Sequence, residues 1–218
     1  MDIRQNKGYF FDLDGTLVDS SPNHAASFQK VLSQYFPDIG EKFDYEKYKG
    51  KATPAVFQEL GIEDDQMVAY LTKEKRRLYL EEIHQRRVPV MPGAKEILEL
   101  LYSMGRKIFI VTSAGLEGAT AILEVYGLKQ WIKGIITSQE VKNNKPYPDI
   151  YLLALQRSDL KPGEVVVIED SLAGQTAAQK AGLSCILVNQ NNIKDAEKEF
   201  KSLQELYLVV KTQLSHLS

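Results

Sequence analysis

Two aspartates stand where an apolar run ends. Asp12 lies inside the run Tyr9–Leu13, and Asp14 and Gly15 follow it. Carboxylates in such a place carry a large desolvation cost unless a positive group or a metal ion meets them. If the strand persists, its period of two points both side chains to the same side. One carboxylate could then attack as a nucleophile while the other manages a proton, and Gly15 would allow a tight turn close to a ligand.

Other polar side chains stand at the ends of later apolar runs. Thr112 and Ser113 end the second run, and Glu169 and Asp170 end the fourth. Lys145 lies in the loop KPYPD after the third run. Because open α/β sheets bind ligands outside the carboxyl ends of their strands, we expect all of these groups to meet in one crevice.

Such a crevice predicts a cation. The four carboxylates of Asp12, Asp14, Glu169 and Asp170 would repel one another unless a hard divalent ion shared them. Mg²⁺ prefers oxygen ligands, takes one or two carboxylates and keeps several waters. A Mg²⁺ site beside Lys145 and backbone amides is a natural place for a phosphate group.

The elements that must position these groups are predicted from hydrophobic periodicity. Continuous apolar runs suit parallel strands that are buried on both faces, and amphipathic segments of helix length lie between them. The strands are expected at Tyr9–Leu13, Lys107–Thr112, Gly134–Thr137, Val165–Ile168 and Cys185–Val188. The helices are expected at Ala94–Met104, Glu117–Tyr126, Pro148–Gln156 and Ser171–Lys180. This alternation predicts an α/β fold, a doubly wound, Rossmann-like parallel-sheet core.

One long interval breaks the alternation. After Asp19 the pattern is helical, with helices expected at His24–Tyr35, Pro54–Leu60 and Asp65–Arg86. The interval is too long for one crossover, so we predict an inserted all-helical cap subdomain over residues 20–88. The core would then hold residues 1–19 and 89–218. The cationic run Lys73–Arg77 is expected to be a solvated helix face. The sequence assigns no role to the apolar patch Leu206–Val210 near the end of the chain.

Composition excludes several classes of function. The 218 residues carry a net charge of −2, which offers no basic face for nucleic acid and no polybasic membrane surface. No apolar run approaches the roughly 18 residues of a membrane span, and the N-terminus does not look like a signal peptide. The one cysteine, Cys185, is expected in the core, as in a reducing compartment. We therefore expect a cytoplasmic protein with no nucleic-acid or membrane partner, monomeric by default, with a dimer left open.

Four segments, in order and at suitable spacings, resemble the motifs of the haloacid dehalogenase superfamily. They are FDLDGTLVDS (11–20), IVTSAG (110–115), NKPYPDIY (144–151) and VIEDSLAGQTAAQKAG (167–182). The resemblance covers nearly the whole chain, and the cap carries the fewest motifs. It implies the fold described above and a helical cap of the C1 type. Within the superfamily, the chain is similar to the group that holds phosphoglycolate phosphatase and β-phosphoglucomutase.

The resemblance also implies roles for the first two motifs. Asp12 resembles the nucleophile that becomes an aspartyl phosphate. Asp14 resembles the acid/base residue whose backbone carbonyl contacts Mg²⁺. Thr112, with the amide of Ser113, resembles the phosphate-binding pair, although Thr112 could instead be only a cap at a strand end.

The last two motifs complete the implied site. Lys145 resembles the lysine that neutralises the nucleophile and the phosphate. Asp170 resembles the metal-positioning acid, and whether Glu169 is a direct Mg²⁺ ligand is left open. Ser171 is expected to cap the next helix.

The dehalogenases and the phosphonate-cleaving branch lack the second aspartate of the first motif. Because this chain has Asp14, both of these reactions are disfavoured, and two others remain. A phosphatase of a small phosphorylated metabolite is the first prediction, and a hexose-phosphate mutase is the alternative. His24 matches a histidine found near this position in the mutase and in some phosphatases, so it separates the two reactions poorly. The cap loop KGKATP (49–54) offers Lys51 where the mutase carries an arginine, and lysine lacks the planar fork that grips a phosphate.

Two further alternatives concern the cap and the class. His24 and Lys51 are candidate substrate contacts, although a solvated cap lysine explains Lys51 equally well. A non-catalytic binding protein on the same scaffold is kept as an alternative. No core catalytic residue of the motifs is missing, which favours an enzyme that acts on a small phosphomonoester.

Overall fold

The chain folds as two compact units. The computed structural model describes residues 6–189 and 199–215. The boundaries between the two units fall after Asp19 and after Val88. All of the assigned strands belong to the α/β unit, while the segment Ser20–Val88 contains only helices.

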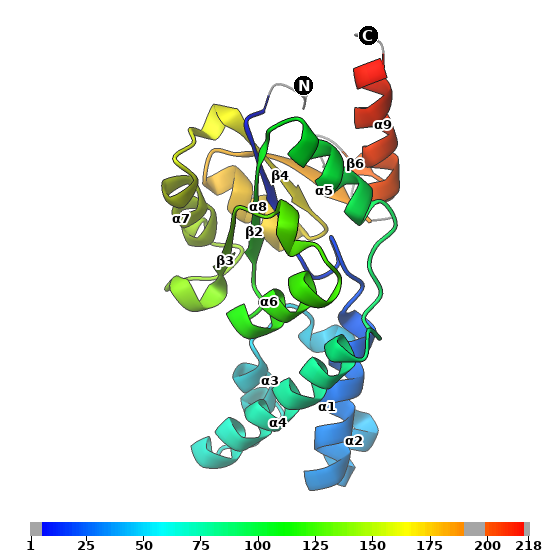
Figure 1. Cartoon of the computed structure of the whole chain (residues 1–218). Helices are drawn as coiled ribbons and strands as arrows, with labels where there is room; N and C mark the ends of the chain where they lie inside the picture. Colours follow the sequence, from blue (N-terminus) through cyan, green and yellow to red (C-terminus); the bar gives the residue numbers. More distant parts are fainter. Residues whose placement is uncertain (1–5, 190–198, 216–218) are drawn as a thin grey trace. The chain divides into compact units, whose positions relative to one another are not determined.

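The α/β unit is built on a parallel sheet of six strands in the order β3-β2-β1-β4-β5-β6 (Figure 1). The strands are β1 (Gly8–Phe11), β2 (Lys107–Thr112), β3 (Gly134–Thr137), β4 (Val165–Glu169), β5 (Ser184–Val188) and β6 (Glu199–Phe200). β1 pairs with both β2 and β4, so that Phe11 lies opposite Ile110 and Ile168. The sequence order reverses at β1, and this switch point is where open sheets bind ligands.

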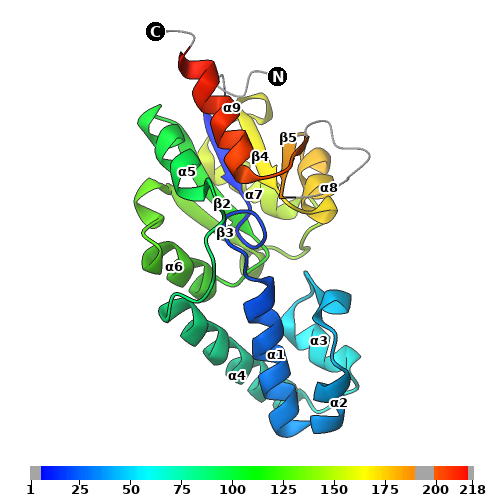
Figure 2. The same ribbon diagram turned by 90° about the vertical axis from the view of Figure 1, so that its right-hand side faces the viewer.

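Helices cover both faces of the sheet. The helices of this unit are α5 (Ala94–Ser103), α6 (Leu116–Val125), α7 (Asp149–Ser158), α8 (Leu172–Lys180) and α9 (Leu203–Ser215). Short 3₁₀ turns are η3 (Lys129–Trp131), η4 (Ser138–Glu140) and η5 (Pro162–Glu164). α7 and α8 pack on one face around Phe10, Val111 and Tyr151, and α5 and α9 lie together on the other face (Figure 2). The strands are therefore buried on both faces, as their continuous apolar runs predict.

The helical unit has its own core. It comprises α1 (Ser21–Tyr35), α2 (Pro37–Lys42), η2 (Tyr45–Tyr48), α3 (Thr53–Glu59) and α4 (Asp65–His84). Phe28, Leu32, Phe57 and Leu71 are buried in one apolar cluster. The side chain of Asp64 caps α4 by accepting hydrogen bonds from the next backbone amides, which fixes where the helix starts.

The predicted fold class, a doubly wound parallel core with an inserted helical subdomain, is confirmed. Cys185 is buried, as expected. In the described residues, no helix is long and apolar enough to cross a membrane.

Several details differ from the expectations. β1 ends at Phe11, so Asp12 and Asp14 follow the strand and do not share its alternation. The helix expected to reach Arg86 ends at His84, because Arg86 adopts a positive φ of 57°. β6, α2 and α9 were not predicted. The apolar patch near the end of the chain lies on α9, where Leu206 and Val210 are buried.

Candidate active site

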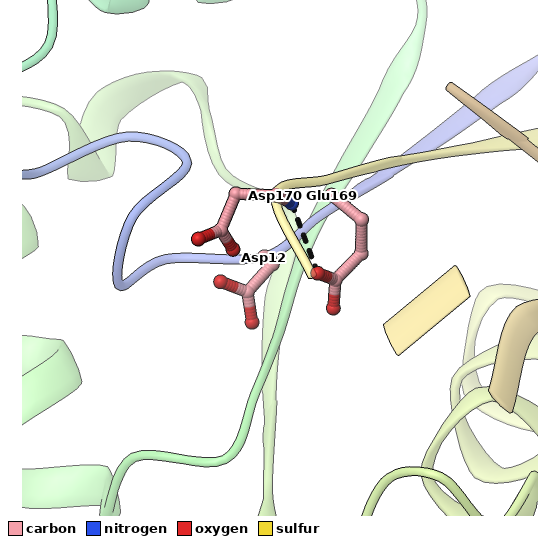
Figure 3. Close-up of side chains that lie close together, drawn as sticks. All are labelled: Asp12, Glu169 and Asp170. Atoms are coloured by element: carbon pink, nitrogen blue, oxygen red, sulfur yellow. Dashed lines mark hydrogen bonds between the residues drawn. The ribbon is translucent and has the colours of Figure 1, made fainter. Parts of the chain in front are cut away.

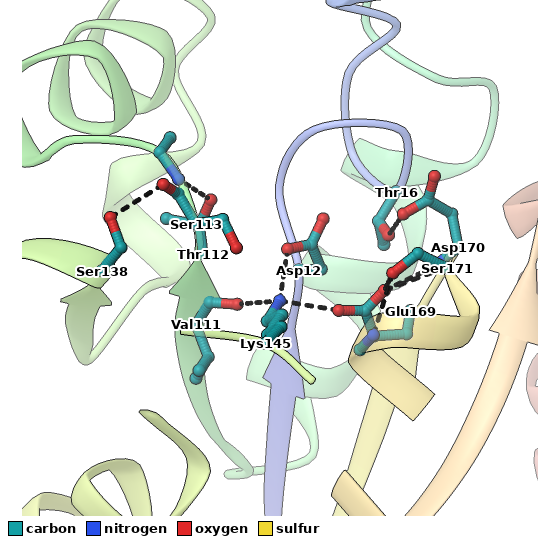
Figure 4. A network of polar contacts seen from close by, with 12 residues as sticks. Asp12, Thr16, Val111, Thr112, Ser113, Ser138, Lys145, Glu169, Asp170 and Ser171 are labelled. Carbon is teal, nitrogen blue, oxygen red and sulfur yellow. Dashed lines mark hydrogen bonds and ion pairs between the residues drawn. The ribbon is translucent and has the colours of Figure 1, made fainter. Parts of the chain in front are cut away.

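A buried lysine and two carboxylates meet at the carboxyl ends of β1 and β4 (Figure 4). The Nζ of Lys145 lies 2.7 Å from Asp12 Oδ1 and 2.6 Å from Glu169 Oε1. It also donates to the carbonyl of Val111 at 2.9 Å. The Lys145, Asp12 and Glu169 side chains are only 5%, 9% and 1% exposed. Charges this deeply buried persist only when they are paired, as they are here.

Asp170 joins these carboxylates. Asp12, Glu169 and Asp170 each offer an oxygen within 4.8 Å of the others, and all three are buried (Figure 3). The three acidic groups face one ammonium group in this cluster. A divalent cation is what would balance the remaining negative charge, and oxygen-only donors suit Mg²⁺. The donor set present in the chain therefore fits this ion.

Burial and the neighbouring charges shift the pKa values of Asp12 and Lys145. Burial raises the pKa of Asp12 well above its usual value, against the pull of the Lys145 ammonium, and the charges of Glu169 and Asp170 add to the rise. Burial alone would lower the pKa of Lys145, but the neighbouring Asp12 and Glu169 carboxylates raise it. Lys145 is therefore held in its charged form, and Asp12 binds a proton more readily than an exposed aspartate does.

Both oxygens of Glu169 are fully engaged. Besides Lys145, Oε1 accepts a hydrogen bond from the Tyr151 hydroxyl at 3.2 Å. Oε2 accepts from the amide of Asp170 at 3.0 Å and from the amide and hydroxyl of Ser171 at 3.0 and 2.9 Å. Five donors therefore fix one carboxylate, and the negative charge lies at the N-terminus of α8, where the helix dipole favours it.

The start of α8 is shaped around that carboxylate. Ser171 is the N-cap and accepts a hydrogen bond from the Gly174 amide at 3.0 Å, which confirms the predicted cap. A Cβ on Gly174 would lie 1.8 Å from Glu169 Oε1, so a larger residue cannot stand there without a shift. The glycine lets the helix approach Glu169 closely.

Asp170 is held by the loop that follows Asp12. Thr16 Oγ1 lies 3.4 Å from Asp170 Oδ1 as a hydrogen-bond donor. Gly15 has a φ of 91°, and a Cβ there would lie 2.1 Å from Asp170 Oδ2. The carboxylate thus rests directly on the glycine backbone, which requires the glycine that the sequence shows. Asp14 is not one of the three members of the acidic group, and its backbone forms an isolated bridge with Val18.

The end of β2 supplies hydroxyl groups beside the central strand. Thr112 Oγ1 accepts a hydrogen bond from the Ala114 amide at 3.0 Å. The Ser113 hydroxyl donates to Asn144 Oδ1 at 3.2 Å, and its carbonyl accepts from the Ser138 hydroxyl at 2.9 Å. In Figure 4, Asp12 and Lys145 lie between these residues and the Glu169–Asp170 side, which agrees with the strand order β2-β1-β4.

The two cap residues singled out in the sequence have different surroundings. His24 Nδ1 lies 2.7 Å from the Nζ of Lys75, and the His24 ring stacks on Tyr79 at a centroid distance of 3.9 Å. Lys51 is 43% exposed and pairs with Glu59 at 2.6 Å. Lys51 is therefore a surface residue with an acidic partner of its own.

Lys75 corrects the prediction that the run Lys73–Arg77 is a solvated face. Lys75 is only 5% exposed, and its ammonium group lies 4.7 Å from the centroid of the Phe28 ring. The signal was its spacing on α4, four residues after Leu71 and three before Leu78, which places it on the buried side. The charges around it in sequence obscured that spacing.

Tyr151 and Asn144 are further site residues that the sequence reading missed. Each lies within or beside the KPYPD loop, next to residues that were identified. Tyr151 lies on the first turn of α7, from which it reaches Glu169. The ammonium group of Lys145 lies 5.3 Å from the centroid of the Tyr151 ring. Burial raises the pKa of the Tyr151 hydroxyl well above its usual value, and the charge of Glu169 adds to the rise, so Tyr151 acts as a neutral donor.

Residues 9–188 match the haloacid dehalogenase-like hydrolase family. A phosphorylated carbohydrates phosphatase of Thermotoga maritima is 30% identical over 193 residues, 86% of this chain and 87% of that protein. Hexitol phosphatase A of Escherichia coli is 32% identical over 183 residues, 84% of this chain and 83% of that protein.

The fold also matches solved structures. The crystal structure of a β-phosphoglucomutase from Clostridium difficile superimposes with a TM-score of 0.78 at 22% identity, covering 98% of this chain and 100% of that one. At this identity the match establishes the fold alone.

These findings show that the chain belongs to the haloacid dehalogenase-like hydrolase family. The resemblance drawn from the four motifs is confirmed. The prediction of a phosphatase is confirmed at the level of enzyme class.

Proposed function

We propose that this protein is a Mg²⁺-dependent phosphatase of a small phosphorylated metabolite, and that sugar phosphates are the substrate class to test first. The observation that carries the proposal is the contact of 2.7 Å between Lys145 Nζ and Asp12 Oδ1, inside a buried cluster with Glu169 and Asp170. The phosphatases among the relatives support the same reaction and this choice of substrate.

In the proposed first step, an Asp12 oxygen attacks phosphorus and the bond from phosphorus to the ester oxygen breaks. Asp14 gives its proton to the departing alkoxide, so that an alcohol and an aspartyl phosphate result. In the second step, water attacks phosphorus and gives a proton to Asp14. The aspartyl bond breaks, inorganic phosphate leaves, and both aspartates return to their starting states.

Other residues stabilise the charge that moves. Lys145 already lies against Asp12 and would meet the equatorial phosphoryl oxygens as they gain charge. Thr112 and the amide of Ser113 would bind the same group from the end of β2. Preorganised donors of this kind stabilise a transition state without having to reorient during the reaction.

The acidic cluster would hold Mg²⁺ through Asp12, Asp170 and the Asp14 backbone carbonyl. When bound, the ion supplies positive charge to the phosphoryl oxygens. We assign Glu169 to positioning in preference to direct coordination, because five protein donors already occupy its oxygens. Glu169 would then fix the positions of the Lys145 side chain and the Asp170 backbone.

The cap would set the choice of substrate. His24, joined to Lys75, is the stronger candidate contact because the pair includes a buried ammonium group. Lys51 is the weaker one, since Glu59 already neutralises it. A mutase must grip a second phosphate on the sugar, and a paired lysine in this loop supports a simple phosphatase in preference to the mutase.

The test is phosphate release from a panel of sugar phosphates and other small phosphomonoesters, with Mg²⁺ and with EDTA. β-Glucose 1-phosphate is included and followed for glucose 6-phosphate. We expect Mg²⁺-dependent release from at least one sugar phosphate and no isomerisation. Isomerisation without net release would replace the phosphatase by the mutase. No turnover of any compound would favour the non-catalytic binding protein.

A further inference from the structure

Besides Asp170, Asn189 also contacts the loop that contains Gly15 and Thr16. Asn189 directly follows β5 and adopts a left-handed conformation with a φ of 60°. Its side-chain amide donates to the carbonyl of Gly15 at 2.8 Å and to the carbonyl of Thr16 at 3.1 Å. One amide group therefore holds two consecutive carbonyls of the loop that carries the catalytic aspartates.

The other end of the Asn189 amide is anchored on α9. Asn189 Oδ1 accepts a hydrogen bond from the amide of Leu203, the first residue of that helix, at 3.0 Å. The amide at a helix start has no partner within the helix, so this contact satisfies it. All three contacts agree on one orientation of the amide, because a flipped group would set donor against donor and acceptor against acceptors.

The start of α9 is itself firmly seated. Leu203 is fully buried, as are Leu206 and Val210 farther along the helix. Gly93, at the start of α5, lies so close that a Cβ there would stand 2.5 Å from the Cα of Gln204. The helix start is therefore a fixed point against which the loop can be held.

From the loop, the contacts continue to the acidic cluster. Thr16 Oγ1 meets Asp170 Oδ1, and the Gly15 backbone lies under the same carboxylate. A continuous series of contacts thus runs from Leu203 through Asn189 and the Gly15–Thr16 backbone to Asp170. Leu203 and Asn189 are 14 positions apart in the sequence, whereas Asn189 lies 173 positions from Thr16 and 174 from Gly15.

We propose that Asn189 is a positioning residue, which fixes the Gly15–Thr16 backbone to the start of α9 and thereby sets the place of the Asp170 carboxylate. The effect on turnover rests on the phosphatase function proposed above. The effect on the loop does not, since it follows from contacts within the chain.

The variant Asn189→Gly tests this with little disturbance of the backbone, because glycine accepts a positive φ without strain. The matched control is Asp159→Gly at the end of α7, which also has a left-handed φ, of 54°, but is exposed. A second variant, Asn189→Asp, keeps an acceptor for the Leu203 amide but turns a carboxylate oxygen toward the carbonyls of Gly15 and Thr16.

Three measurements are made on the full chain. Amide hydrogen exchange is followed by mass spectrometry in a peptide that covers residues 13–18 and in peptides from β2 and β4. The kcat and KM are measured with the best substrate of the panel. The concentration of Mg²⁺ that gives half of its effect on the melting temperature is measured without substrate.

We expect Asn189→Gly to speed exchange in residues 13–18 on the order of tenfold, the size of effect of losing one or two partly buried hydrogen bonds. Exchange in β2 and β4 should not change. The kcat should fall on the order of tenfold with KM within about twofold, and the Mg²⁺ concentration should rise severalfold. Asn189→Asp should show the same changes, at least as large.

The proposal is overturned if Asn189→Gly matches Asp159→Gly in all three measurements. It is also overturned if exchange rises equally in residues 13–18, β2 and β4, since Asn189 would then contribute only to global stability. If the wild type turns over no phosphomonoester, the phosphatase function fails, and the exchange data still decide the role of Asn189.

Discussion

The two units of this protein differ in the charges that they bury, although both carry surface ion pairs, such as Lys7 with Glu164 in the α/β unit. In the α/β unit, Lys145 and its carboxylate partners are almost fully buried, and Lys145 meets Asp12 from 133 positions away in the sequence. In the helical unit, the ion pairs lie on the surface between near neighbours, such as Arg77 with Glu74 and Glu81. Surface pairs of this kind contribute little to stability, whereas a buried cluster costs much to form unless every charge is met. The buried cluster is therefore where we expect chemistry.

Lys75 is the exception that refines this contrast. It is a buried charge in the helical unit, and its contacts with His24 and the Phe28 ring are local to that unit. The distinguishing feature of the α/β cluster is thus a set of carboxylates around a lysine, and not burial alone.

The largest effect is expected from removing the proposed nucleophile. Asp12→Asn keeps the size of the side chain but removes the attacking charge, so turnover should fall by at least about four orders of magnitude. The measurement is phosphate release at saturating substrate, with circular dichroism to confirm the fold. Asp159→Asn, a change of the same kind at an exposed position, should keep normal turnover. Substantial activity of Asp12→Asn would rule out the aspartyl phosphate.

The next effect concerns stability and contrasts two lysines. Lys145→Met leaves the Asp12 and Glu169 carboxylates buried without their shared cation, so the free energy of unfolding should fall by about 3–5 kcal/mol. Lys51→Met removes an exposed partner of Glu59 and should change it by less than about 1 kcal/mol. Urea denaturation in EDTA measures both.

A double variant sharpens this contrast. Adding Asp12→Asn to Lys145→Met removes one of the two carboxylates that have lost their shared cation, so it should recover part of the lost stability. Equal losses at Lys145 and Lys51, or no recovery in the double variant, would contradict the difference drawn between the two units.

The smallest effect is a pH dependence of stability that has opposite signs at Asp12 in the α/β unit and at Glu82 in the helical unit. The folded-state pKa of Asp12 is raised, so its contribution to stability is present in acid, below the ordinary pKa, and is lost as pH rises through the raised one. Hydrogen bonding to Arg87 lowers the folded-state pKa of Glu82, so its contribution is present above the ordinary pKa and is lost as pH falls through the lowered one.

The corresponding variants are Asp12→Asn and Glu82→Gln, compared with the wild type in EDTA between about pH 4 and 8. Asp12→Asn should gain in stability relative to the wild type as pH rises. Glu82→Gln should be less stable by up to about 1 kcal/mol near neutrality, and the difference should shrink in acid. Thermal unfolding across the pH series measures both, and slopes of the same sign would refute the contrast.

Much of the α/β unit could be predicted from the sequence. The five longer strands are largely continuous apolar runs, because a parallel sheet covered on both faces buries most residues of a strand. Their carboxyl ends share one edge of the sheet, so Asp12, Lys145 and Glu169 could be grouped without coordinates. β6 has only two residues, Glu199 and Phe200, too few for periodicity to show.

The sequence by itself therefore determined the class of fold, the family, and the residues from which the acidic cluster is made. These follow from local composition and from the order of the motifs along the chain. Only the tertiary structure decided how each group is held. The contacts of Lys145 and Tyr151 with Glu169, the burial of Lys75 and the contact of Asn189 with the Gly15–Thr16 loop bring together residues that are apart in sequence. Hydrogen bonds and burial between such segments depend on packing that no local pattern encodes.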